Sequence, residues 1–237
     1  MRKELYFLLM LLAAVRILHA QSPQSDSSEA LQNLKRAVVK MQEEYKTLDK
    51  LHLIMSVQVF ESDSASKPYF SEIAIIRRDK NNYLYRFGTQ EMLMNEKYLL
   101  MIDRSSKEIF CNTRSLKSEV NTFKDAFQMN IDSLLQFYGK TIFMGEEDRI
   151  EHFRLFQDKG DVSQVDLFID TSSGLIKRFD YSYRDKQYVK IDFRVFDRAP
   201  IFEKNIFSET NYVIVQEEKL VASEKFKGYN VSDVNQN

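Results

Sequence analysis

Cysteine, glycine and proline are scarce in this chain of 237 residues, and tryptophan is absent. The single cysteine, Cys111, cannot form an intramolecular disulfide, so the hydrophobic core must provide the stability. Six glycines and three prolines exclude collagen-like and low-complexity architectures and argue against long flexible linkers. A chain of this length can bury a sufficient core without cross-links.

Excess basic charge and long apolar runs are also missing. The chain carries 34 Lys and Arg against 35 Asp and Glu, a net charge of −1. Residues 1–20 carry a net +2, so their removal would leave −3. This mild acidity argues against nucleic-acid binding, which favours a basic stripe. After residue 20 no segment reaches about 18 uninterrupted apolar residues, and we expect a soluble mature chain.

The first 20 residues have the pattern of a secretory signal peptide. Arg2 and Lys3 give a positive start, an apolar stretch of about eleven residues follows, and Ala20 supplies a small residue before Gln21. The stretch is too short to span a bilayer comfortably. We therefore predict a signal peptide over 1–20 and a single exported domain over 21–237.

Hydrophobic periodicity predicts an α+β fold. Apolar residues recur at spacings of three and four from Leu31 to Leu48, behind a capping pair, Asp26 and Glu29, which predicts a helix of about six turns. A second helical pattern runs from Leu116 to Tyr138. Alternating runs predict strands over 51–59, 70–78, 83–87, 90–94, 97–103, 107–111, 149–157, 164–170, 174–183 and 187–196, with two further possible strands near 201–207 and 212–217.

A sheet of that size must twist and curl. We expect a curved antiparallel sheet, an incomplete β-barrel, with the helices covering its concave face. No interdomain linker and no internal repeat is evident in the sequence.

Catalytic and metal-binding patterns are nearly missing. The two histidines after residue 20, His52 and His152, are not paired in sequence with a Cys or a carboxylate at ligand spacing. Cys111 ends an apolar strand, which favours a buried, inert thiol. We expect no enzyme, no cofactor and no metal. A hydrolase stays the weakest alternative, which a His–carboxylate pair in the fold would revive.

Three other features are open to two interpretations each. The carboxylates of 146–148 fit a solvated turn or a cation site, and the basic cluster 77–80 fits a solvated strand end or a contact with an anionic head group or a protein. Methionines accompany 18 Phe and 12 Tyr. Met and aromatic side chains line adaptable apolar cavities, and they also fill ordinary cores.

Four segments stand out besides the order of elements: 73–78, a strand ending in two arginines; 94–103 and 169–178, two hairpins; and 190–193, the strand that follows. These segments and their order resemble the motifs of the LolA/LolB-like superfamily of periplasmic lipoprotein carriers. The resemblance extends over most of 27–231 as a pattern.

This resemblance implies a half barrel of about eleven strands with a helical lid latched by Arg78. It also implies a periplasmic monomer that takes acyl chains of lipoproteins, or other envelope lipids, from an inner-membrane release machinery to an outer-membrane acceptor. The alternative on the same fold is a non-catalytic sensor or protein-interaction module with a packed interior.

Strand parity and helical spacing predict the residues of an apolar cavity, although parity does not decide which face of the sheet is concave. The candidates are Leu53, Met55, Val57, Ile73, Ile75, Tyr85, Met92, Leu100, Phe127, Leu134, Val165, Leu167, Phe179, Tyr181, Ile191 and Phe193.

Overall fold

The computed structural model describes residues 28–46, 48–114 and 138–233. The chain divides into two compact units: unit 1 comprises Met1–Thr47 and Asn121–Lys186, and unit 2 comprises Leu48–Val120 and Gln187–Asn237. The predicted signal peptide and most of the second predicted helix lie outside the described residues. The single domain over 21–237 stays a prediction.

Unit 1 combines helix α2, Ser28–Lys46, with four antiparallel strands in the order β10-β9-β8-β7. The apolar stripe of α2 buries Leu34, Val38 and Met41, and the helix packs against β7 and β10. The strands are β7 (Lys140–Glu147), β8 (Ile150–Phe156), β9 (Val162–Asp170) and β10 (Leu175–Tyr183).

The turn between β9 and β10 fixes α2 to this sheet. Lys40 donates a hydrogen bond from Nζ to the carbonyl oxygen of Thr171 at 2.7 Å. Gly174 in the same turn has φ +70°, and a Cβ there would approach the Lys40 side chain to 3.1 Å. Glycine therefore provides both the left-handed turn and the space for the lysine stem.

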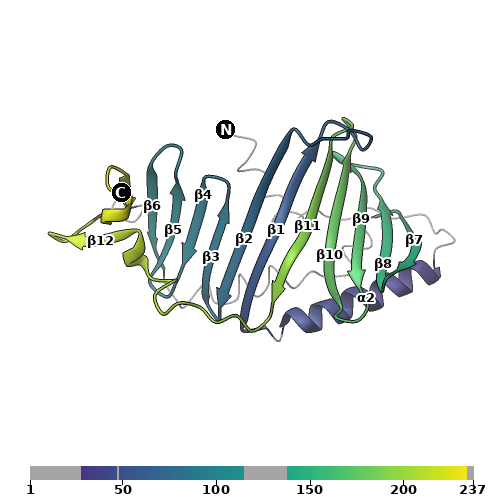
Figure 1. Cartoon of the computed structure of the whole chain (residues 1–237), viewed down its shortest axis with the longest axis horizontal. Coiled ribbons are helices and arrows are strands. Elements are labelled where there is room, and N and C mark those ends of the chain that lie inside the picture. The colour runs from purple at the N-terminus through teal and green to yellow at the C-terminus, as the bar shows by residue number, and fades with distance from the viewer. Residues whose placement is uncertain (1–27, 47, 115–137, 234–237) are drawn as a thin grey trace. The chain divides into compact units, whose positions relative to one another are not determined.

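Unit 2 holds the other eight strands of the main sheet, in the order β14-β6-β5-β4-β3-β2-β1-β11. Figure 1 labels the strands from β6 to β11 of this order. All neighbours are antiparallel except β14 and β6. The strands are β1 (Lys50–Phe60), β2 (Phe70–Asp79), β3 (Asn82–Phe87), β4 (Gln90–Met94), β5 (Tyr98–Asp103), β6 (Glu108–Thr113), β11 (Tyr188–Asp197) and β14 (Asn230–Asp233).

A C-terminal segment, residues 198–233, covers one face of β3–β6. It contains a separate hairpin, β12 (Val213–Gln216) with β13 (Lys219–Ala222), and the short 3-10 helices η1 (Glu209–Asn211) and η2 (Glu224–Phe226). Tyr212, Val213 and Phe226 of this segment join the core that Leu93 and Leu100 build on the sheet. We call this side of the unit 2 sheet the Leu100 face, and the opposite side the Leu53 face.

A buried carboxylate anchors the C-terminal segment to the Leu100 face. Glu91 has a side-chain exposure of 2%, and it accepts a hydrogen bond from the hydroxyl of Tyr212. The guanidinium groups of Arg104 and Arg86 lie 2.6 and 3.4 Å from its two oxygens. Burial alone would raise the pKa of Glu91, but the hydrogen bonds from Tyr212 and Arg104 and both arginine charges outweigh it and lower the pKa.

The predicted class, α+β with an antiparallel sheet that does not close into a barrel, is confirmed. The main sheet has twelve strands rather than about eleven. The possible strand at 201–207 is wrong, because that stretch consists of turns and irregular backbone. The sequence analysis missed β7, β13 and β14. Within the described residues, no helix is long and apolar enough to cross a membrane.

Replacing Glu91 by glutamine should destabilise the fold by about 2–4 kcal/mol at pH 7, because Arg104 would lose a buried counter-ion. Urea unfolding followed by circular dichroism measures this loss, with Glu96→Gln, an exposed carboxylate nearby, as the control.

The pKa of Glu91 is lowered by folding, so its stabilisation is present above about pH 4.5 and is lost as the pH falls through the folded-state pKa. The difference between wild type and Glu91→Gln should therefore shrink in acid. A constant difference down to pH 2 would contradict the assignment.

Candidate functional site

A continuous row of apolar side chains crosses six neighbouring strands on the Leu53 face. Directly opposed partners in an antiparallel ladder point to the same side of the sheet, so the register fixes the row. Neighbouring strands lie about 4.8 Å apart, so a row across six strands is about 24 Å long. This exceeds the roughly 15 Å thickness of the hydrocarbon layer in one bilayer leaflet. The apolar row consists of Leu53, Ile76, Tyr85, Met92, Met101 and Phe110, one from each strand β1–β6 in turn.

The apolar row changes from buried to open along its length. Leu53 is 3% exposed, Tyr85 and Met92 are half-buried, and Met101 and Phe110 are each 40% exposed. Burial raises the pKa of the Tyr85 hydroxyl to about 12, as expected in apolar surroundings. The open end thus presents a thioether and a phenyl ring, an adaptable pair for an apolar ligand.

Arg78, the predicted lid latch, lies on the Leu53 face one side-chain position beyond Ile76 on β2. Its Cζ is 5.5 Å from the centre of the Tyr83 ring, and its Nε donates to the carbonyl oxygen of Lys80 at 3.2 Å. The arginine therefore borders the apolar row. Its role as a latch stays a prediction.

The predicted cavity residues do not share one face. Within unit 2, the Leu100 face carries Ile73, Ile75 and Leu100, so these three cannot line a cavity on the other side. Leu100 is fully buried under the C-terminal segment, whereas Ile73 is 38% exposed. The remaining unit 2 candidates, on the Leu53 face, are Leu53, Met55, Val57, Tyr85, Met92, Ile191 and Phe193.

The other candidates belong to unit 1. Val165, Leu167, Phe179 and Tyr181 share one face of its sheet, where Val165 and Leu167 are buried. Phe127 and Leu134 lie outside the described residues. Ligand binding by all of these candidates stays a prediction.

The opposite face of the unit 1 sheet forms the His–carboxylate pair that sequence spacing did not reveal. Nε2 of His152 lies 2.5 Å from Oδ1 of Asp166, and Nε of Arg154 donates to the same oxygen at 2.8 Å. The His152 ring also stacks on Phe168, with centroids 4.2 Å apart. Asp166 accepts a further hydrogen bond from Gln164. The observed partners thus include no hydroxyl or thiol nucleophile, and the network fits a structural role.

Other reactive groups in the described residues are equally isolated. Cys111 is fully buried, as predicted, and burial raises the pKa of its thiol to about 11. No cluster of three or more His, Cys, Asp or Glu side chains that could hold a metal occurs in the described part of the chain. Nε2 of His52 is buried without a hydrogen-bond partner, and burial lowers the pKa of that ring.

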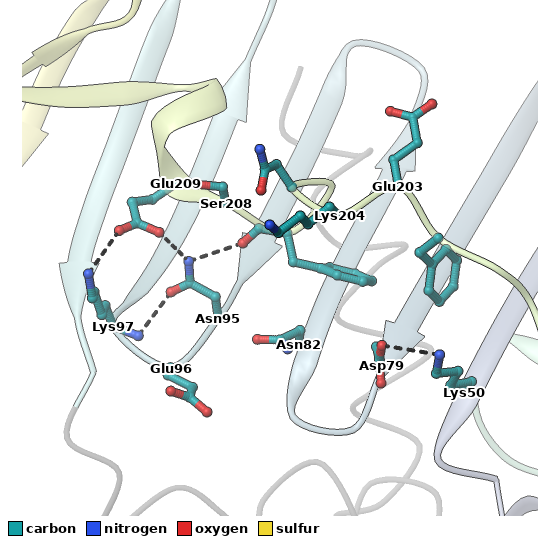
Figure 2. Close-up of a pocket in the computed structure, with 13 residues that line it drawn as sticks. Lys50, Asp79, Asn82, Asn95, Glu96, Lys97, Glu203, Lys204, Ser208 and Glu209 are labelled. Atoms are coloured by element: carbon teal, nitrogen blue, oxygen red, sulfur yellow. Dashed lines mark hydrogen bonds and ion pairs between the residues drawn. The ribbon is translucent and has the colours of Figure 1, made fainter.

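A polar cleft of about 440 Å³ opens between the C-terminal segment and the strand ends of unit 2 (Figure 2). Asn95 organises it: its Nδ2 donates to Glu209 at 2.8 Å, and its Oδ1 accepts from the backbone N–H of Lys97. Lys97 also pairs with Glu209 at 3.4 Å, and Lys50 pairs with Asp79 at 3.7 Å. Because these charges already neutralise one another, the cleft fits an attachment point for the segment better than a ligand site.

No family model matches this sequence, and no curated protein matches it. One similar solved structure is an uncharacterised conserved protein from Thermus thermophilus, with 9% identity over 85% of this chain and 99% of the other and a TM-score of 0.47. A LolA superfamily protein from Nitrosomonas europaea has 10% identity over 74% and 97%, with a TM-score of 0.34. A chain of the Pseudomonas aeruginosa MucA/MucB complex has 8% identity over 76% and 61%, with a TM-score of 0.44.

These likenesses are too remote to carry an argument about function. In the described residues, a long first helix, a run of six strands and a second run of five follow the order that the LolA/LolB-like resemblance implies. The helical insert expected between the two runs lies outside the described residues.

Leu100 and Met101 are neighbours on opposite faces of β5. Replacing each by alanine should lower the free energy of unfolding by different amounts, because one side chain lies in the core and the other on an open surface. Leu100→Ala removes a fully buried side chain and should cost about 2–4 kcal/mol. Met101→Ala removes a side chain that is 40% exposed and should cost less than about 1 kcal/mol. Urea unfolding monitored by circular dichroism measures both. Equal losses would contradict an open Leu53 face at β5.

Proposed function

We propose that this protein is a non-catalytic carrier of the bacterial cell envelope that binds acyl chains of lipoproteins or other envelope lipids along the apolar row. The observation that supports this best is the row itself, which is unbroken across six strands and half-exposed at Met101 and Phe110. The C-terminal segment covers the Leu100 face of β3–β6, so an apolar ligand has the other face of these four strands available.

The physical chemistry of acyl chains explains why such a row suffices. Each methylene moved out of water contributes about 0.8 kcal/mol, so a shuttle that crosses an aqueous compartment need only cover the chain with apolar side chains. Methionine adapts to chains of differing shape. No bond is made or broken, which suits a chain whose described residues hold no nucleophile next to the His152–Asp166 pair.

The route of the cargo is proposed from the sequence. A signal peptide over 1–20 would place the carrier in the periplasm, and the LolA/LolB-like resemblance suggests loading at the inner membrane and delivery to an outer-membrane acceptor.

The second candidate function is an envelope sensor or protein-interaction module. The β1 end of the Leu53 face favours it, because Leu53, Met55 and Val57 are at most 9% exposed and therefore already packed. In that case the exposed side chains of β5 and β6 would contact a protein instead of a lipid.

Binding of acyl chains can be tested on the full chain with a diacylated peptide and native mass spectrometry. Met101→Glu would place a charge on the acyl path and should weaken binding about tenfold or more. Ile73→Glu is the matched control, because Ile73 is 38% exposed on the opposite face of the same sheet. Circular dichroism checks that both variants are folded.

Uptake by wild type and by Ile73→Glu, with loss in Met101→Glu, would support the carrier. No uptake of the diacylated peptide by the wild-type protein would contradict the carrier function and favour the interaction module. Equal losses in the two variants would contradict the apolar row as the site.

A further inference from the structure

The charges on the Leu53 face are separated along the strands. On β1–β6 of the described structure, Arg78 is the only basic strand residue of this face, and it lies at the β2–β3 turn end. The acidic residues Glu72, Asp103 and Glu108 belong to the same face at the other strand ends. The apolar row runs between these two ends. An anionic group on this face is therefore attracted to one end and repelled from the other.

Arg78 has no counter-ion in the described part of the chain. Its nearest acidic neighbour in sequence, Asp79, pairs with Lys50 instead. The contacts of Arg78 are the hydrogen bond from Nε to the carbonyl oxygen of Lys80 and the stacking over Tyr83. Both hold the guanidinium in place, and neither neutralises it. A half-buried cation that lies beside apolar side chains and has no counter-ion can attract the negative charge of a ligand.

A guanidinium group has the geometry for such a ligand. Its terminal nitrogens bind a carboxylate or a phosphate through two parallel hydrogen bonds. Ile76, the second member of the apolar row, is the next side chain on the same face of β2 at a distance of about 7 Å. A head group at Arg78 and a chain along the apolar row can therefore belong to one molecule.

We infer that Arg78 binds the anionic head group of an amphiphile whose acyl chain lies on the apolar row. This inference rests on the proposed carrier function and adds the head-group chemistry, a carboxylate or a phosphate. It gives Arg78 a ligand-binding role in place of the predicted latch. A free fatty acid and a phospholipid with an exposed phosphate are the two sources of such a group.

The test compares three probes with the same chain length: palmitate, hexadecyl phosphate and uncharged hexadecanol, each below the concentration at which it aggregates in water. Competition against a fluorescent acyl probe on the full wild-type chain should show at least one anion binding about tenfold tighter than hexadecanol, with the advantage reduced by added salt. Preference for palmitate identifies a fatty acid as the source, and preference for hexadecyl phosphate identifies a phospholipid.

Arg78→Gln should remove the advantage of the anion and leave hexadecanol binding unchanged, and Arg78→Lys should retain part of it. Arg77→Gln is the matched control, because Arg77 precedes Arg78 on the opposite face of β2 and should change nothing. Circular dichroism confirms that each variant is folded.

Equal affinity of the wild-type protein for all three probes would overturn the head-group site and leave the carrier function standing. The same would follow from equal losses in Arg77→Gln and Arg78→Gln. Binding of none of the three probes would overturn the carrier function and the head-group site together.

Discussion

The alternation of side chains along each strand is the constraint on which the rest of unit 2 depends. Every strand has two faces, and a pairing shifted by one residue would exchange them. On the Leu100 face, Leu93, Leu100 and Cys111 meet the C-terminal segment and form a closed core. Glu91 holds that segment in place through Tyr212.

Because the C-terminal segment covers one face of β3–β6, the proposed ligand is assigned to the other face. The Leu53 face is packed at β1 and becomes open toward β6, where Met101 and Phe110 reach 40% exposure. The same alternation places Arg78 beside the apolar row and the acidic residues at the far strand ends. Apolar area and charge are thus arranged on one surface in a pattern that suits an amphiphile, and the buried Glu91 keeps its counter-charges on the other side.

The assignment of faces shows where sequence reasoning succeeded and where it failed. Within one strand it was reliable: Leu53, Met55 and Val57 do share a face, and Tyr85 and Met92 share it with them. Between strands it assigned two strands, β2 and β5, to the wrong face. Met92 is opposed by Met101 and not by Leu100, and Leu53 is opposed by Ile76. The length and geometry of the connecting turn decide which residue comes opposite, and a single miscounted turn residue moves a whole strand to the other face.

The sequence by itself indicated α2 and most of the strands, because periodicity and capping are local properties of the chain, but it missed β7, β13 and β14. It also determined that Cys111 would be buried, since an apolar strand surrounds it. Only the tertiary structure decided which face the C-terminal segment covers, which carboxylate is buried at its centre, and that His152 meets Asp166. Those contacts join residues 14 to 121 positions apart, and sequence periodicity carries no information about pairings at that separation.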